Sequence, residues 1–194
     1  MRIRCFLAIE LSENLKRSLE SLRSRVDLPQ FDVRWVEPRN LHLTLRFLGE
    51  IPEEDIETVS EAAQKTAEAT ESFSLLIQGL GAFPTLSSPR VVWAGVEPAE
   101  PVVRLERKLS RELDRLNWPP PDKPFRPHLT IGRVKSSRGK GELRRLLERT
   151  QREKIGEIRV TDIGLIRSQL RPAGPLYTNL KRFTFARQAG NGEA

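Results

Sequence analysis

The chain has 194 residues, which is enough for one large domain or two small lobes and too short for an assembly of several domains. Its residues are 38% hydrophobic and 30% charged, and no apolar run reaches the roughly 18 residues of a membrane-spanning helix. Residues 1–10 contain too short an apolar run for a secretory signal, and the single Cys5 excludes an internal disulfide. We therefore expect a protein of the reducing cytoplasm.

The charge is unevenly distributed along the sequence. The formal net charge of +7 is the sum of −4 over residues 1–97 and +11 over residues 98–194. A positive second half is typical of proteins that bind a polyanion, most plausibly nucleic acid. A solvated, arginine-rich surface such as a heat-stable protein carries explains the same excess. The charge makes RNA a candidate partner without selecting it.

The first half of the chain predicts strands that alternate with helices. Residues 2–10 alternate in hydrophobicity with a period of two, as in a half-buried strand, and Ser12 is a suitable N-cap for a helix to about residue 27. Further predicted strands lie at 33–36, 41–49, 73–80 and 90–96. A second helix is predicted at 53–70, and residues 81–89 are predicted to form a turn region.

The second half shows the same alternation. Helices are predicted at about 100–117 and 142–154, and strands at 125–134, 157–169 and 176–185. The proline-rich segment 118–124 predicts a stiff connector, and residues 172–175 predict a tight turn between antiparallel strands. We expect an α+β fold: a duplicated, two-lobed module whose largely antiparallel, curved sheets line a central groove, with helices outside. One two-lobed domain would cover residues 1–186, followed by a flexible tail at 187–194.

The two histidines of the chain lie in near-identical tetrapeptides. They are His42-Leu-Thr-Leu45 and His128-Leu-Thr-Ile131, so a threonine follows each histidine by two positions. Residues i and i+2 of a strand point to one face, so each histidine and its threonine project together while the aliphatic pair faces the core. A single strand histidine is commonly a satisfied, half-buried residue, but a duplicated pair indicates chemistry.

Two such motifs that face each other suit displacement at phosphorus. One neutral imidazole takes a proton from the attacking oxygen, and one imidazolium gives a proton to the leaving oxygen. The hydroxyls of Thr44 and Thr130 can donate to the phosphate oxygens as negative charge builds. The two histidines could instead bind zinc, but two imidazoles without Cys, Asp or Glu at ligand spacing make a poor set of tetrahedral ligands. We therefore predict neither a metal nor another cofactor.

The paired motifs resemble the two-histidine phosphoesterase superfamily, and their surroundings are similar to its RNA 2′,3′-cyclic phosphodiesterase branch, also called 2′-5′ RNA ligase. The resemblance covers about residues 2–186. The segments that carry it are Arg4-Cys-Phe-Leu-Ala-Ile9, Trp35, Asn40-Leu-His-Leu-Thr-Leu-Arg-Phe-Leu-Gly49, Pro89-Arg-Val-Val-Trp93, Phe125-Arg-Pro-His-Leu-Thr-Ile-Gly-Arg133, Leu165-Ile-Arg-Ser168, Gly174 and Tyr177.

The resemblance implies a two-lobed fold and hydrolysis of a terminal 2′,3′-cyclic phosphate to a 2′-phosphate. It implies that His42 is the proton donor to the departing 3′ oxygen and that His128 is the base that activates water. With an RNA 5′-hydroxyl in place of water, the reverse reaction would form a 2′-5′ linkage. The sequence alone does not distribute these two roles between the histidines.

Five further residues are candidates for substrate binding. Alternation places Arg46 on the face of His42 and Arg126 on the face of His128. Arg133 belongs to a family-like segment but alternates to the opposite face, unless a bulge near Gly132 redirects it. Tyr177 and Phe6 are candidates for stacking on a base, and Tyr177 also for a hydrogen bond to phosphate. Structural roles in ion pairs, strand edges or the core are open for all five.

Two rival functions remain open at this stage. The first is a non-catalytic module that binds RNA ends, and the second is a phosphodiesterase for small cyclic nucleotides or 2′-5′ oligonucleotides. RNA ends with a 2′,3′-cyclic phosphate, tRNA among them, are the expected partners. We expect the protein to be a monomer and not to associate with membranes.

Overall fold

The computed structural model describes residues 1–121, 123–172 and 174–186. The regular elements of this part of the chain occur in the order β1 (Arg2–Glu10), α1 (Glu13–Val26), β2 (Val33–Trp35), η1 (Pro38–Asn40), β3 (His42–Pro52), α2 (Asp55–Glu68), β4 (Phe73–Thr85), β5 (Ser88–Glu97), α3 (Glu100–Asp114), β6 (Leu129–Val134), α4 (Lys140–Arg149), β7 (Lys154–Val160), β8 (Asp162–Arg171) and β9 (Gly174–Thr184). None of these helices is long and apolar enough to cross a membrane.

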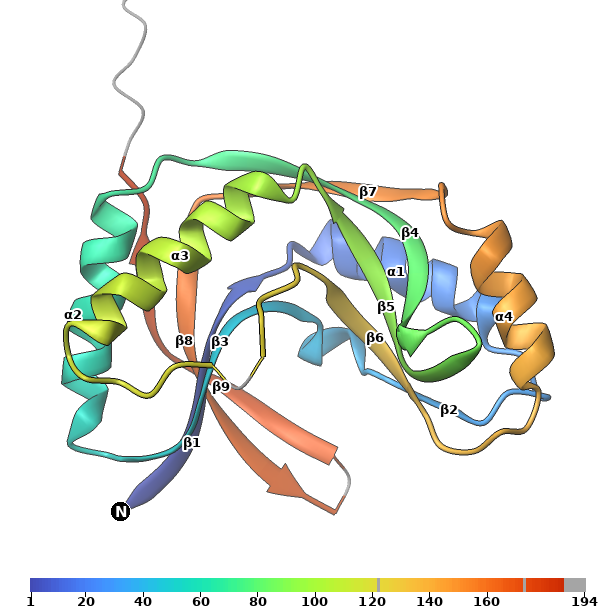
Figure 1. Ribbon diagram of the computed structural model, residues 1–194, viewed down its shortest axis with the longest axis horizontal. Helices are drawn as coiled ribbons and strands as arrows, with labels where there is room; N and C mark the ends of the chain where they lie inside the picture. The colour runs from blue at the N-terminus through green and yellow to red at the C-terminus, as the bar shows by residue number, and fades with distance from the viewer. Residues whose placement is uncertain (122, 173, 187–194) are drawn as a thin grey trace, which may run out of the picture.

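The strands form two curved sheets in which neighbouring strands run antiparallel (Figure 1). The order in one sheet is β3-β1-β8-β9, and we call it the His42 sheet because β3 begins at His42. The order in the other is β2-β6-β5-β4-β7, and we call it the His128 sheet because β6 directly follows His128. The predicted α+β class with two antiparallel, curved sheets is confirmed.

Each sheet takes strands from both halves of the sequence. The His42 sheet joins the early strands β1 and β3 to the last two strands, β8 and β9. The His128 sheet joins β2, β4 and β5 of the first half to β6 and β7 of the second. The duplicated sequence therefore folds as two interleaved sheets. The expectation of a single two-lobed domain over residues 1–186 stays a prediction, and the tail at 187–194 lies outside the described residues.

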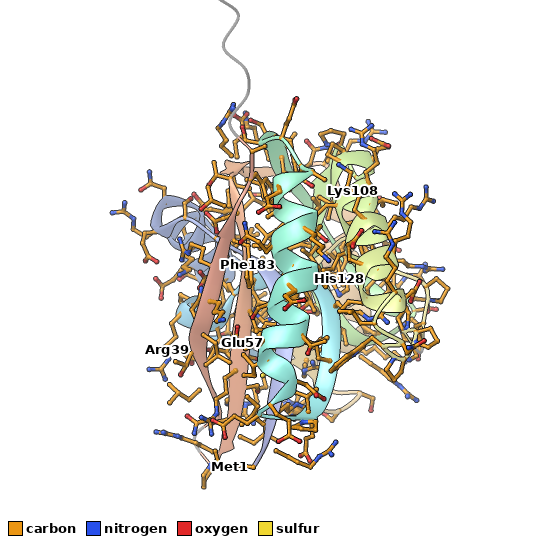
Figure 2. The ribbon with its side chains drawn as sticks, turned by 90° about the vertical axis from the view of Figure 1, so that its left-hand side faces the viewer. Met1, Arg39, Glu57, Lys108, His128 and Phe183 are labelled. Atoms are coloured by element: carbon orange, nitrogen blue, oxygen red, sulfur yellow. The ribbon has the colours of Figure 1, made fainter. Side chains whose placement is uncertain are left out.

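The helices cover the sheets in pairs. Helices α2 and α3 pack against each other, and α2 also contacts β3, β8 and β9 of the His42 sheet. Figure 2 shows these two helices side by side, with Glu57 on α2; its carboxylate accepts hydrogen bonds at 2.7 Å from Lys181 on β9. Helix α1 packs against β7, and α4 packs against β4 and β5, so these two helices cover the His128 sheet.

The alternation around the two motifs is confirmed by burial. Leu43 and Leu45 in β3, and Leu129 and Ile131 in β6, are all buried in the main apolar core. Helix α1 begins as expected, because the Ser12 hydroxyl accepts a hydrogen bond from the Leu15 amide at 3.3 Å. The four buried aliphatic residues fix which side of each motif faces the core, and the histidines therefore lie on the opposite side.

Three predicted elements differ from the structure. The predicted turn region at 81–89 is mostly strand, since β4 runs to Thr85 and pairs with β5 from Ser88, and the turn itself is confined to residues 86 and 87. The predicted strand at 157–169 is two strands, β7 and β8, which lie in different sheets and are separated at Thr161. The predicted strand at 125–134 begins only at Leu129, because residues 125–128 follow the proline-rich connector without pairing in a ladder.

Candidate active site

His42 is held by the backbone just before it. Its ring is half-buried, and Nδ1 lies 2.7 Å from the carbonyl oxygen of Asn40 in η1. Because a carbonyl only accepts, Nδ1 carries the hydrogen and Nε2 of the neutral ring is the atom left for proton transfer. Asn40 is itself buried, and its amide donates to the Pro175 carbonyl on β9 at 3.0 Å. The position of the His42 ring is thus tied to a distant strand of the same sheet.

His128 repeats this arrangement. Its Nδ1 lies 2.6 Å from the carbonyl oxygen of Arg126, again two residues earlier in the chain. The same reasoning assigns the hydrogen to Nδ1 and makes Nε2 the reactive atom. The duplicated tetrapeptides therefore have a duplicated geometry, in which both imidazoles are oriented by a main-chain acceptor.

The two threonines stand on their strands as alternation predicts. Thr44 pairs with Ala8 on β1, and Thr130 pairs with Trp93 on β5. Both side chains are half-buried. Contacts between β3 and β6 bring the two motif-bearing strands next to each other.

Two aromatic side chains enclose the His42 ring. Phe6 stacks on it with ring centroids 4.6 Å apart, and Tyr177 meets it edge-on at 5.2 Å. Phe6 and Tyr177 contact each other at 5.1 Å and belong to a small apolar cluster separate from the main core. The structure therefore brings two of the proposed binding residues into contact with His42.

The same surroundings affect the protonation of His42 and Tyr177. Burial lowers the pKa of His42, while the Asn40 carbonyl and the charge of Glu10 oppose part of that shift. Burial raises the pKa of the Tyr177 phenol, and the nearby charges of Arg133 and Arg4 act against it. Tyr177 is thus a neutral hydroxyl at physiological pH, able to donate a hydrogen bond.

The prediction that Arg46 shares a face with His42 is wrong. The β1–β3 ladder pairs Ala8 with Thr44 and Leu7 with Arg46, so Leu45 is an extra residue at a bulge. The bulge turns Arg46 to the buried side, where its guanidinium donates to the Ser110 hydroxyl and to the Pro119 carbonyl. Arg46 therefore links β3 to α3 and to the proline-rich connector.

The bulge at Leu45 also brings an unpredicted aromatic residue to the face of His42. Phe47 follows Arg46 in the ladder and pairs with Phe6. It therefore lies on the side of Phe6, with ring centroids 6.1 Å apart, and is 67% exposed. A second bulge follows at Leu48, because Cys5 pairs with Gly49. Sequence alternation alone assigns Phe47 to the opposite face, so only the bulge at Leu45 reveals it.

Arg133 is redirected in the same way, as the sequence analysis allowed. In the β5–β6 ladder Trp93 pairs with Thr130 and Val92 with Gly132, so Ile131 is the extra residue. Arg133 then pairs with Val91, which lies on the same face of β5 as Trp93. Its charge acts on Tyr177 of the other sheet. The Arg126 side chain is exposed, and its backbone carbonyl orients His128.

Phe83 is a site residue that the sequence analysis missed. Its ring meets His128 edge-on with centroids 4.9 Å apart and also contacts Trp93 at 5.4 Å. Glycine, proline and serine residues between positions 79 and 89 made this segment resemble a turn. The apolar segment Leu80-Gly-Ala-Phe83, which continues the predicted strand at 73–80, is the signal that could have placed Phe83 on a strand.

Comparisons with known proteins identify the family of this chain. The family model of LigT-like phosphoesterases matches residues 9–93 and 95–177. A protein of Methanothermobacter thermautotrophicus named RNA 2′,3′-cyclic phosphodiesterase is 37% identical over 94% of this chain and 99% of its own. An Aquifex aeolicus protein of the same name is 37% identical over 93% of this chain and 96% of its own.

Solved structures show the same relationship. A crystal structure of a Thermus thermophilus protein superposes with a TM-score of 0.80 at 34% identity, covering 94% of this chain and 98% of that one. E. coli LigT in complex with 3′-AMP superposes with a TM-score of 0.76 at 27% identity, covering 95% and 99%. The chain belongs to the LigT-like phosphoesterase family.

Proposed function

We propose that this protein hydrolyses a terminal RNA 2′,3′-cyclic phosphate to a 2′-phosphomonoester with its two histidines as acid and base. The observation that carries the proposal is the repeated Nδ1 contact, to the carbonyls of Asn40 and Arg126, which directs the reactive Nε2 of both rings away from the main chain. The names of the curated relatives support the substrate class. Proton transfer by two such groups needs no metal.

The reaction then balances as an in-line displacement. His128 Nε2 removes a proton from water as the water oxygen bonds to phosphorus. The bond between phosphorus and the 3′ oxygen breaks, and protonated His42 gives its proton to that oxygen. The products are a 3′-hydroxyl and a 2′-phosphate, and the two histidines end in exchanged protonation states. Thr44 and Thr130 donate to the non-bridging oxygens, where negative charge accumulates.

The surroundings of the histidines suit an RNA end. Phe47 offers an exposed ring beside Phe6, and a base can stack on such a surface. Arg133 and Arg4 supply positive charge near Tyr177, whose neutral hydroxyl can donate to phosphate. We assign the cyclic phosphate to the histidines and the base and neighbouring phosphate to these residues.

The same groups can act in reverse on an RNA 5′-hydroxyl. His128 would then deprotonate the hydroxyl in place of water, and the product would be a 2′-5′ linkage. We include tRNA ends among the proposed substrates, and we propose a monomer that acts in the cytoplasm.

The deciding experiment is an end-group assay in EDTA with an RNA that carries a 2′,3′-cyclic phosphate. Wild type should leave a 2′-phosphate, and His42→Ala and His128→Ala should each lose about 10²–10⁴-fold in kcat while keeping a wild-type melting profile. An inactive wild type, or a fully active His42→Ala variant, would refute the proposal. Binding without turnover would instead indicate a non-catalytic module.

Salt dependence separates the polymer from a small cyclic nucleotide. An RNA held at several phosphates should lose affinity steeply with salt, with a slope near −0.7 per phosphate contact. A mononucleotide lacks those contacts, so its KM should change little. Equal salt slopes for both substrates would indicate that only the terminal nucleotide is recognised.

A further inference from the structure

An acidic residue stands directly across the ladder from His42. Glu10 is the last residue of β1 and pairs with His42, the first residue of β3. Residues opposite each other in an antiparallel ladder share one face, with Cβ atoms about 4.5–5.5 Å apart. Strand β1 has no bulge of its own, so Glu10 alternates onto the side of Phe6 and Ala8, which is the His42 face.

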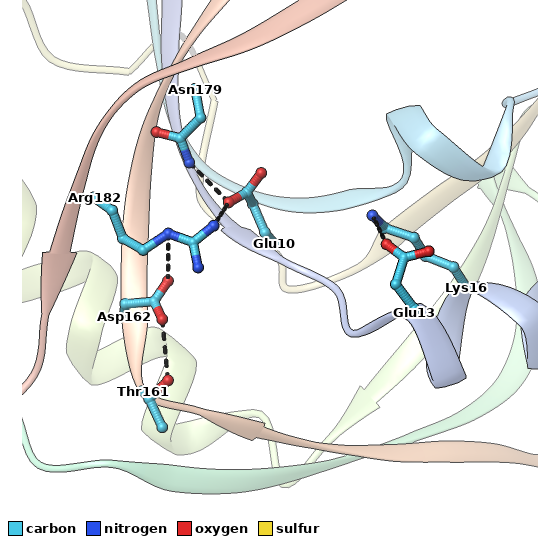
Figure 3. A network of polar contacts seen from close by, with 7 residues as sticks. All are labelled: Glu10, Glu13, Lys16, Thr161, Asp162, Asn179 and Arg182. Carbon is cyan, nitrogen blue, oxygen red and sulfur yellow. Dashed lines mark hydrogen bonds and ion pairs between the residues drawn. The ribbon is translucent and has the colours of Figure 1, made fainter.

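The Glu10 carboxylate is fixed by two donors from β9. Its Oε2 accepts from the Asn179 amide at 2.8 Å and from the Arg182 guanidinium (Figure 3). Arg182 Nε lies 3.8 Å from Asp162 Oδ1 on β8, and the Thr161 hydroxyl donates to the other oxygen of Asp162 at 3.0 Å. The network therefore joins three strands, and Glu10 Oε1 takes no part in either contact.

The other charged and titratable groups near His42 come from different elements. Tyr177 of β9 contacts the ring, and Arg4 of β1 and Arg133 of β6 act on Tyr177. Arg182 of β9 is engaged by Glu10 and Asp162. Glu10 is thus the carboxylate whose charge acts on His42, and it opposes the effect of burial on that imidazole.

We propose that Glu10 is a positioning residue, which Asn179 and Arg182 hold in place, and that its negative charge favours the protonated form of the half-buried His42 imidazole, the form that donates to the leaving oxygen. This inference rests on the proposed function, because it assumes that His42 is the proton donor. A buried donor without a nearby anion would lose its proton at too low a pH to act near neutrality. The network adds the charge of a carboxylate to the support that the Asn40 carbonyl already gives the protonated His42 ring.

The test follows the titration of His42 directly. The chain contains two histidines, so their imidazole proton resonances can be assigned with a single His128→Asn variant. Glu10→Gln keeps the shape of the side chain and removes the charge. We expect it to move the midpoint of the His42 titration to lower pH by roughly 0.5–1 unit. This shift is smaller than that of a close ion pair, because solvent and salt screen the charge.

Glu50→Gln is the matched control. Glu50 pairs with Arg4 on the same two strands, six residues along β1 from Glu10. That separation is about 20 Å, well beyond the Debye length of about 8–10 Å, so the His42 midpoint should not move. An equal shift in both variants would refute a specific role for Glu10.

The kinetic readout distinguishes support of the donor from a merely structural role. Loss of a charge that stabilises the imidazolium should move the alkaline limb of kcat/KM to lower pH by the same amount as the resonance midpoint, with near wild-type kcat at the acidic optimum. An unmoved His42 midpoint in an active enzyme would overturn the proposal. If Glu10→Gln shifts the His42 midpoint but the wild type has no phosphodiesterase activity, the proposed function is refuted and the coupling between Glu10 and His42 still stands.

Discussion

Arg46, on the strand that begins at His42, donates a hydrogen bond to the backbone carbonyl of Pro119. A second hydrogen bond, at 3.3 Å, reaches the Ser110 hydroxyl, which in turn donates to buried Glu106 at 2.7 Å. Burial lowers the pKa of the guanidinium, and the charge of Glu106 opposes this shift. These contacts hold together β3, helix α3 and the connector that leads to His128.

This linkage predicts that Arg46 contributes to stability rather than to substrate binding. Arg46→Met should lower the free energy of unfolding by about 1–3 kcal/mol, because the Ser110 hydroxyl and the Pro119 carbonyl lose the hydrogen bonds that the buried guanidinium donates. The KM for RNA of the folded fraction should change little. Urea unfolding measures the change in stability. The control is Arg107→Met, at an exposed position on α3. A stable variant with a greatly raised KM would return Arg46 to the binding site.

Arg133 is predicted to join the two sheets electrostatically. Its positive charge opposes the raised pKa of Tyr177, so Arg133→Gln should raise that pKa further. Tyr177 is the single tyrosine of the chain, so phenolate absorbance reports it without ambiguity. The variant should also reduce kcat/KM for RNA about tenfold and lower the salt slope by about one.

Arg90→Gln provides the control for Arg133. Arg90 adjoins Val91, the ladder partner of Arg133, but alternates to the other face of β5. Its removal should leave both the Tyr177 titration and the salt slope as in wild type. Identical effects of the two variants would show that net charge, and not the redirected side chain, is responsible.

The lowered pKa of His42 predicts that the free energy of unfolding falls when the solution is acidified. Its pKa is lowered in the folded state, while the unfolded imidazole has an ordinary value near 6.5. Between these two values the unfolded chain binds a proton that the folded chain does not, so stability falls as the pH falls through that window. Urea unfolding at pH 7.5 and 5.5 should show a larger loss for wild type than for His42→Asn. Equal losses would contradict the depressed pKa.

Two glycines predict opposite effects of the same substitution. A Cβ on Gly81 would lie 2.2 Å from the ring of Trp93, beside Phe83 and His128. Gly81→Ala should therefore cost about 1–3 kcal/mol of stability and reduce turnover. Gly141, near the start of α4, has no neighbour within 4 Å, so Gly141→Ala should stabilise by about 0.5–1 kcal/mol. Thermal unfolding of both variants checks the pair, and a neutral Gly81→Ala would refute the contact with Trp93.

The sequence predicted the site where local periodicity holds and failed where long-range pairing decides. His42 and Thr44 share a face because two residues of strand separate them, and Ser12 caps α1 through a contact three residues away. Arg46 was placed on the wrong face, and Phe47 was not predicted as a site residue, because a bulge depends on how β3 meets β1, which no residue of β3 encodes alone. Phe83 was missed because the glycines and prolines around it lie inside a hairpin that only β5 completes.

The interleaving of the two sheets has a consequence for any attempt to divide the molecule. A fragment that ended after β5 would contain His42 but would leave β1 without its neighbour β8, and β4 without β7. The complementary fragment would contain His128, but β6, which directly follows it, would lack both of its neighbours, β2 and β5. We therefore expect neither fragment to fold on its own, and co-expressed fragments should be stable only after they reassemble into the intact arrangement of strands.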